Sequence, residues 1–228
     1  MLIGFPQLLD KVNEHIDRLD YAREPMNLYE PVKYILALGG KRIRPVMMLM
    51  AYNMYRDDVD KILDPALALE IYHNFTLLHD DLMDNADVRR GKPTVHKRWD
   101  ANTAILSGDV MLSLADVYMS RIDDAYFRQV MATFHQTSIE IAEGQQYDMD
   151  FETRTDVAEQ EYIEMIRLKT SVLLACALKI GAILGGASED DAAHLYRLGE
   201  CIGLAFQLRD DYLDVYGDPK VFGKKIGG

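Results

Sequence analysis

The chain has 228 residues, 49% of them hydrophobic, and its 37 acidic and 25 basic side chains give a formal net charge of −12. This length supplies one sizeable core, so we expect a single domain over residues 1–228. The acidic balance argues against nucleic acid or an anionic membrane surface as the primary partner.

The N-terminus has no basic region followed by an apolar signal core. The longest apolar candidate, 171–186, spans 16 residues and contains Lys179, so it is shorter than the roughly 20 residues needed to cross a bilayer. We therefore expect a cytoplasmic protein without a transmembrane segment. Cys176 and Cys201 lie in apolar stretches, which favours buried free thiols in a reducing compartment.

The apolar spacing is helical nearly throughout, and no alternating strand pattern lasts beyond a few residues, so an all-α fold is predicted. The expected helices cover residues 7–20, 28 onward, 46–55, 64–84, 102–120, 124–147, 156–185 and a final one that carries 210–214. Residues 88–93 are basic and contain glycine, which predicts a loop.

Short local signals predict where these helices begin and end. Pro31 is expected in the first turn of its helix, and Asp64 followed by proline is typical of an N-cap. Asp156 with Glu159, and Ser188 with Asp191, resemble capping boxes, and Gly185-Gly186 resembles a C-cap.

Three carboxylates crowd the end of the helix predicted to stop near residue 84. The i to i+4 spacing places Asp80 and Asp84 one turn apart on one face, with Asp81 turned by about 100°. A helix C-terminus carries partial negative charge, so a cation is favoured there. Carboxylate oxygens suit Mg²⁺, which proteins usually hold with one or two carboxylates plus substrate phosphates. The alternative is a solvated acidic face.

The same pattern returns downstream, where Asp210 and Asp214 again stand at i and i+4 behind an apolar helical run. Two such helix ends that faced each other would hold several divalent ions and a polyphosphate between them.

The chain resembles the trans-isoprenyl diphosphate synthase (polyprenyl synthetase) family in five segments that occur in family order. They are DDLMD at 80–84, DDYLD at 210–214, GGKRIRP at 39–45, RRGKPTVH at 89–96 and LKT at 168–170. The resemblance implies an all-α, single-domain bundle of long helices around a central cavity, of the isoprenoid synthase type. It also implies a Mg²⁺ cofactor, with Mn²⁺ as a substitute, held by Asp80, Asp84 and Asp210.

The implied reaction joins isopentenyl diphosphate to an allylic diphosphate (dimethylallyl, geranyl or farnesyl). The resemblance assigns the isopentenyl diphosphate site to Lys41, Arg44, His73 and Arg90, and it also implies that Gly40 binds substrate. A basic surface turn is the alternative for Lys41 and Arg44. A lone histidine on an apolar helix, such as His73, is more often a core residue.

The resemblance assigns the allylic diphosphate to a second set of residues. Arg89, Lys169, Thr170 and Lys224 are implied ligands of this diphosphate, and Gln207 is implied to lie near the reacting carbons. Lys169, Thr170 and Gln207 are the implied catalytic residues. Simple charge balance with the preceding aspartates is the alternative for Arg89 and Arg90.

The family members usually continue through several more helices after the segment that ends here at Gly228, so we expect that the C-terminal helices are lacking. A homodimer is expected from the resemblance. Two other functions remain open, a class I terpene cyclase and a non-catalytic partner subunit. The GGKRIRP cluster disfavours the cyclase because a cyclase needs no second diphosphate site, and the intact aspartates disfavour the non-catalytic subunit.

Product length should depend on side chains below Asp80 on the same helix. On a helical wheel Thr76 lies about 40° from Asp80 but is too small to close a pocket, and Tyr72, about 80° away, is preferred as the stopper. The family resemblance instead points to Phe75 followed by the small Thr76. Both arguments predict a short C15–C20 product, with geranylgeranyl diphosphate expected first and farnesyl diphosphate second.

Overall fold

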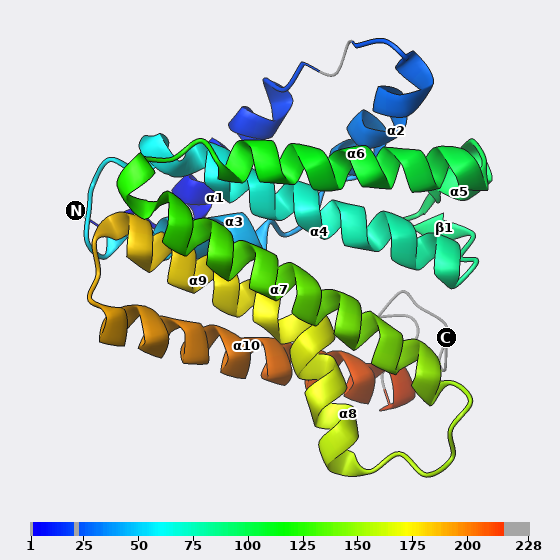
Figure 1. The fold of residues 1–228 in the computed structure, drawn as a ribbon. Coiled ribbons are helices and arrows are strands. Elements are labelled where there is room, and N and C mark those ends of the chain that lie inside the picture. The colour runs from blue at the N-terminus through cyan, green and yellow to red at the C-terminus, as the bar shows by residue number, and fades with distance from the viewer. Residues whose placement is uncertain (1, 21–22, 217–228) are drawn as a thin grey trace. The chain divides into compact units, whose positions relative to one another are not determined.

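The computed structural model describes residues 2–20 and 23–216, which form helices and one short hairpin (Figure 1). The prediction of an all-α fold is confirmed. The chain divides into two compact units, Met1–Arg128 and Gln129–Gly228, which are described one at a time. The single domain over 1–228 stays a prediction.

The first unit is organised around α4 (Leu63–Met83), whose residues 65–72 are all buried. α4 lies side by side with α6 (Ala101–Met119), as Figure 1 shows. The other elements are α1 (Phe5–Asp17), α2 (Met26–Ala37), α3 (Ile43–Asn53), the 3-10 turn η1 (Val59–Ile62), β1 (Val88–Arg89), β2 (Lys92–Pro93) and α5 (Val95–Arg98). Apolar residues recur along α4 on all sides, which suits a helix that other helices surround.

In the second unit, α10 (Glu189–Tyr216) packs along α9 (Val172–Gly185). Glycines allow this close approach. A Cβ atom at Gly199 would come within 2.5 Å of Ala175 Cα, and one at Gly203 would overlap Ser171. The remaining elements are α7 (Asp124–Phe151), which begins in the first unit, α8 (Glu159–Ile166) and the π-helical segment η2 (Arg167–Ser171).

Within the described part of the chain, one continuous helix, Glu159–Gly185, is long and apolar enough to cross a membrane by length and composition. Its most apolar window is 83% buried inside the protein. That burial is what the core helix of a folded unit shows, so apolar composition here reflects packing.

Two predicted helix starts are wrong. Asp64 does not cap α4, because its carboxylate binds His15 Nε2 at 2.7 Å and Arg121 Nη1 at 3.1 Å. The helix begins instead at Leu63, directly after η1. Pro31 lies inside α2, past its first turn, because that helix already begins at Met26.

The capping signals of the second unit are partly confirmed. Ser188 Oγ accepts a hydrogen bond from the Asp191 amide at 3.1 Å, and Gly186 is left-handed (φ 85°) after α9, as predicted. The predicted box at Asp156 and Glu159 is wrong. Asp156 accepts from Arg154 instead, and α8 is capped by Glu161, which accepts from the Ala158 amide at 2.9 Å.

Both cysteines are free thiols, as predicted, but only Cys176 is buried. Burial raises the pKa of the Cys176 thiol to about 12, so it stays protonated. Cys201 is exposed on α10, contrary to the prediction, because it lies on another side of the helix than Gly199, which faces α9, and Gly203, which faces η2.

Candidate active site

The C-terminal end of α4 carries Asp80 and Asp81, and Asp84 is the C-cap of this helix. Arg89 Nε donates hydrogen bonds to both carboxylate oxygens of Asp81, at 2.9 and 2.8 Å. Arg89 Nη2 lies 2.7 Å from Asp81 Oδ1 and 3.7 Å from Asp80 Oδ2. A cation was expected at this crowded helix end, and Arg89 supplies one.

The predicted loop at 88–93 is a small antiparallel hairpin that positions two arginines. Val88 pairs with Pro93 and Arg89 with Lys92, so Arg90 and Gly91 form the two-residue turn. Both turn residues have positive φ, 52° and 74°, as a type I′ turn requires. Because of this turn, the side chains of Arg89 and Arg90 point in different directions. Arg89 binds the aspartates, while Arg90 lies against Gly40.

Gly40 has a φ of 152°, which favours glycine, and it faces the Arg90 guanidinium. A Cβ atom at residue 40 would lie 3.1 Å from both terminal nitrogens of Arg90 and 3.3 Å from Cζ. The GGKRIRP and RRGKPTVH segments are therefore in contact through Gly40 and Arg90, although 50 positions separate these two residues.

His73 lies among guanidinium groups of the same unit. Burial lowers the pKa of His73 well below its usual value, and the charges of Arg44, Arg90, Arg89 and Arg42 lower it further. His73 is therefore neutral and can donate one hydrogen bond. Burial also lowers the pKa of Arg44 to about 10, an effect that Glu70 opposes. The structure thus brings Arg44, His73, Arg89, Arg90 and Gly40 together as one cationic group, which we call the arginine cluster.

Lys41, adjacent to this cluster in sequence, is exposed, whereas Arg42 is only 5% exposed and points inward. Arg42 Nη1 donates to Glu70 Oε1 at 2.6 Å and Nη2 donates to the Leu36 carbonyl at 2.7 Å. Asn74 donates to the same Glu70 oxygen at 3.1 Å. Sequence reasoning missed Glu70 and Asn74. The signal was a glutamate inside an otherwise apolar helix, which is rarely buried without a partner.

Removing Glu70 should destabilise the protein strongly. The side chains of Arg42 and Glu70 are 4% and 3% exposed, so Glu70→Ala leaves a buried charge without its counter-ion. Such a loss typically costs about 3–5 kcal/mol. We expect the urea midpoint of unfolding, followed by circular dichroism, to fall accordingly.

Asp60→Ala is the matched control, because Asp60 pairs with Lys11 at 2.7 Å but its side chain is 67% exposed. Exposed pairs contribute about 0–1 kcal/mol. Equal midpoints for Glu70→Ala and Asp60→Ala would contradict the role given to the buried pair.

The candidate product-length residues lie on α4, one to two turns before Asp80. Tyr72 is buried and its ring meets Phe75 edge to face, with 5.5 Å between centroids. Phe75 meets His79 in the same way at 4.8 Å. His79 in turn lies against α6, where Gly108 leaves room for its ring. Thr76 Oγ1 donates to the His73 carbonyl at 2.8 Å.

In the second unit, Lys169 belongs to the π-helical segment η2. π-helical turns are rare in proteins, and those that occur are often found at functional sites. Lys169 Nζ donates to Asp148 Oδ2 of α7 at 2.5 Å. Gly144, one turn earlier on α7, lets the backbone at Lys169 approach, because a Cβ atom there would overlap it. Asp148 and Gly144 carry no sequence signal of their own and were not predicted.

Thr170 and Gln207, both predicted, are joined directly. Thr170 Oγ1 donates to Gln207 Oε1 at 3.0 Å, and Gln207 Nε2 donates to Asp211 Oδ1 at 2.8 Å. The Tyr162 hydroxyl of α8 donates to Asp211 Oδ2. Burial and then this bond raise the Tyr162 pKa, so it remains a donor. Sequence reasoning missed Tyr162.

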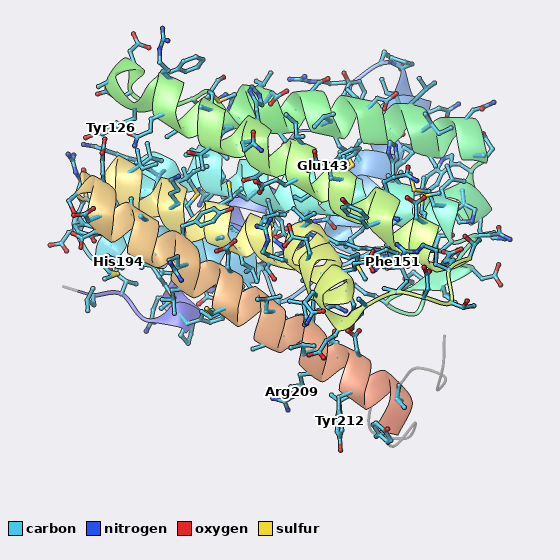
Figure 2. The ribbon with its side chains drawn as sticks, turned by 60° about the horizontal axis from the view of Figure 1, so that its bottom comes forward. Tyr126, Glu143, Phe151, His194, Arg209 and Tyr212 are labelled. Carbon is cyan, nitrogen blue, oxygen red and sulfur yellow. The ribbon has the colours of Figure 1, made fainter. Side chains whose placement is uncertain are left out.

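Two further predicted residues are described only in part or not at all. Asp210 is half-buried on α10, whose last turns Figure 2 shows near the labelled Arg209 and Tyr212. Asp214 belongs to α10, but its side chain is not described, and Lys224 lies outside the described residues.

Among residues 2–20 and 23–216, no three His, Cys, Asp or Glu side chains gather closely enough to hold a metal ion by themselves. The donors at the α4 end are nonetheless hard carboxylate oxygens beside an arginine cluster that suits phosphate. This donor set fits Mg²⁺, which is usually bound through one or two carboxylates and completed by substrate phosphate oxygens and water.

Comparison with known proteins places these features in one family. Residues 25–228 match the polyprenyl synthetase family model. The chain is 44% identical to a geranylgeranyl diphosphate synthase of Methanosarcina mazei, over 95% of this chain and 67% of that protein. It therefore spans about two thirds of the length of that relative.

Solved structures agree. A crystal structure of a geranylgeranyl pyrophosphate synthase matches with a TM-score of 0.94 and 50% identity, covering 99% of this chain and 69% of that one. The geranylgeranyl pyrophosphate synthetase of Pyrococcus horikoshii matches with a TM-score of 0.92 and 38% identity, covering 98% and 70%. By sequence and by fold, the chain belongs to the polyprenyl synthetase family and to its short-chain trans-isoprenyl diphosphate synthases.

Proposed function

We propose that the chain is a Mg²⁺-dependent trans-prenyltransferase that condenses isopentenyl diphosphate with an allylic diphosphate to give a C15–C20 prenyl diphosphate. The observation that carries the proposal is the pairing of two unlike sites in the first unit. Within the arginine cluster, Arg89 holds the carboxylates at the end of α4, while Arg44, Arg90 and neutral His73 would provide donors for a second diphosphate. A class I terpene cyclase would need no such second diphosphate site.

The carboxylate side suits the substrate that ionises. Asp80, Asp84 and Asp210 would hold Mg²⁺ or Mn²⁺, which when bound neutralises the allylic diphosphate and improves it as a leaving group. Arg89 and Lys169 would contribute positive charge to the same diphosphate, together with Lys224, which lies outside the described residues. Asp148 holds Lys169 by an ion pair until an anionic ligand competes for its ammonium group.

The cationic side suits isopentenyl diphosphate. Arg44 and Arg90 offer forked guanidinium donors, and exposed Lys41 offers a point charge. His73 is neutral, so it would donate a hydrogen bond to a phosphate oxygen without adding charge. Gly40 gives Arg90 the room to take this position.

In the reaction, the allylic C–O bond breaks and the electrons leave with the diphosphate. The terminal alkene carbon of isopentenyl diphosphate then bonds to the allylic carbon, and loss of a proton gives the next allylic diphosphate. The released diphosphate accepts that proton, so no protein nucleophile is needed. Thr170 and Gln207 would lie beside the reacting carbons, and catalysis rests on orientation, electrostatics and exclusion of water.

Incubation of the protein with Mg²⁺, isopentenyl diphosphate and dimethylallyl or farnesyl diphosphate tests this function. We expect a longer prenyl diphosphate that forms only when both substrates are present. A cyclase would consume the allylic substrate alone, and a non-catalytic partner subunit would consume neither. Either of those results would overturn the proposal. A cytoplasmic location stays a prediction from the sequence, and a homodimer stays a prediction from the family resemblance.

Product length should depend on the aromatic pair of α4. Phe75 and Tyr72 lie within two turns, roughly 11 Å, of Asp80, so their rings would stop a growing chain early. We expect the wild type to make mainly geranylgeranyl diphosphate, and Phe75→Ala or Tyr72→Ala to lengthen the product by at least one isoprene unit. Chromatography of dephosphorylated products measures this.

Phe5→Ala is the control, because it removes an aromatic ring at an exposed position of α1. It should leave the product unchanged. The proposal that these two rings limit chain growth is wrong if the wild type already makes chains of eight or more units. It is also wrong if neither α4 variant changes the product length.

A further inference from the structure

One hydrogen-bonded chain crosses three helical segments of the second unit. It runs from Thr170 in η2 to Gln207 and Asp211 in α10 and on to Tyr162 in α8. Asp211 accepts with both carboxylate oxygens, one from the Gln207 amide at 2.8 Å and one from the Tyr162 hydroxyl. We call these four residues the Tyr162 relay.

The donors and acceptors of the relay's hydrogen bonds can be assigned in only one way. A carboxylate only accepts hydrogen bonds, so the atom of Gln207 that faces Asp211 must be its amide nitrogen. The amide oxygen then faces Thr170, and the Thr170 hydroxyl must donate to it. Within the relay, Thr170 Oγ1 therefore keeps its lone pairs, and Gln207 Oε1 keeps one of its two.

The packing of α10 against η2 fixes the distance between Gln207 and Thr170. A Cβ atom at Gly203 would overlap Ser171, so α10 lies directly against η2 one residue after Thr170. Gln207 is one helical turn after Gly203 on the same side of α10. The close approach therefore keeps Gln207 within reach of Thr170, and the orientation of its amide is left to Asp211 and Tyr162.

We infer that Tyr162 and Asp211 are positioning residues that lock the Gln207 amide, so that Thr170 and Gln207 turn oxygen lone pairs toward the allylic carbon that becomes positive. This inference rests on the proposed function. If the Gln207 amide were flipped, its partially positive N–H groups would lie near the developing cation. A dipole in that orientation would raise the barrier to ionisation, whereas the oxygen facing the cation would lower it. Tyr162 contributes by occupying the second oxygen of Asp211, which keeps that carboxylate facing Gln207.

The test measures charge preference by binding, without turnover. Two diphosphates of the same shape serve as probes, one with a protonated tertiary amine in place of the cationic allylic carbon and one with an uncharged carbon there. An analogue that carries the charge of a transition state binds more tightly to a site built for that charge. We expect the wild type to prefer the amine, and Tyr162→Phe to lower that preference about tenfold, which is the effect of about 1.4 kcal/mol.

Tyr212→Phe is the matched control. Tyr212 is adjacent to Asp211 in sequence but is 62% exposed, and Figure 2 shows it pointing away from the helices. It should keep the wild-type preference. In a Gln207→Leu background, adding Tyr162→Phe should cost no further preference, because residues that act through one another are not additive. Asp211→Asn repeats the test if Tyr162→Phe fails to fold.

Steady-state kinetics give a second readout. Tyr162→Phe should lower kcat while leaving the KM for isopentenyl diphosphate unchanged, since none of the relay residues is among those proposed to bind that substrate. An unchanged amine preference in folded Tyr162→Phe and Asp211→Asn would overturn the inference, as would equal binding of both probes by the wild type. Failure of the proposed function would show separately, as absence of product from the wild type.

Discussion

Asp80→Asn and Asp210→Asn should each lower turnover by about 10²–10³-fold or more, because each removes a carboxylate that would hold the metal ion needed to neutralise the departing diphosphate. The helical circular dichroism spectrum should stay unchanged, since asparagine keeps the shape of the side chain. Binding of Mn²⁺ in the presence of an allylic diphosphate, followed by electron paramagnetic resonance, should weaken in parallel.

Asp87→Asn is the control for this pair of variants. Asp87 follows the first motif closely, but its side chain is 81% exposed and pairs with Lys97 at 3.0 Å. It should keep wild-type turnover. Full activity of the wild type in excess chelator would contradict the metal requirement.

Substitutions in the two basic groups should affect different substrates. Lys41→Ala and Arg44→Ala should raise the KM for isopentenyl diphosphate, and Lys169→Ala should raise the KM for the allylic substrate. A hydrogen bond between charged groups contributes about 1.5–3 kcal/mol, which corresponds to about 10–100-fold in affinity. Steady-state kinetics with each substrate varied in turn measure the two effects separately.

Lys92→Ala is the matched control, because Lys92 is an exposed lysine on the same hairpin as Arg89 and Arg90. It should leave both constants near wild type. Equal losses for both substrates in all three variants would show that the two diphosphate sites are not separable in this way.

Helical periodicity alone predicts most elements of this fold, because apolar residues recur at helical spacing in most of its helices. Helix starts are predicted less well where tertiary partners compete for the capping residue. Asp64 resembles an N-cap in the sequence, yet its carboxylate binds His15 and Arg121, which are 49 and 57 positions away. No local signal indicates those partners.

The family segments predict the charged residues of the site, and the structure shows several of them in contact. The supporting residues were missed for a common reason. Tyr162 is 49 positions from Asp211, Asp148 is 21 from Lys169 and Glu70 is 28 from Arg42. Tyr162 and Asp148 are ordinary polar residues of their helices until folding places them against charged groups, and Glu70 is marked only by its place in an apolar helix.

The second aspartate of each acidic motif illustrates the same limit. The sequence leaves open whether Asp81 and Asp211 bind metal directly. In the structure, Arg89 contacts both oxygens of Asp81, and Gln207 and Tyr162 occupy those of Asp211. The second aspartate of each motif is therefore held by neighbouring side chains, and only the fold shows which side chains hold it.

In the proposed reaction, one allylic diphosphate is consumed for each new carbon–carbon bond to isopentenyl diphosphate. Phosphorus nuclear magnetic resonance of a reaction with Mg²⁺, dimethylallyl diphosphate and carbon-13-labelled isopentenyl diphosphate measures this directly. We predict one inorganic diphosphate released for each labelled unit that mass spectrometry finds in the product. Release of diphosphate without incorporation of label, or no release at all, would contradict the account.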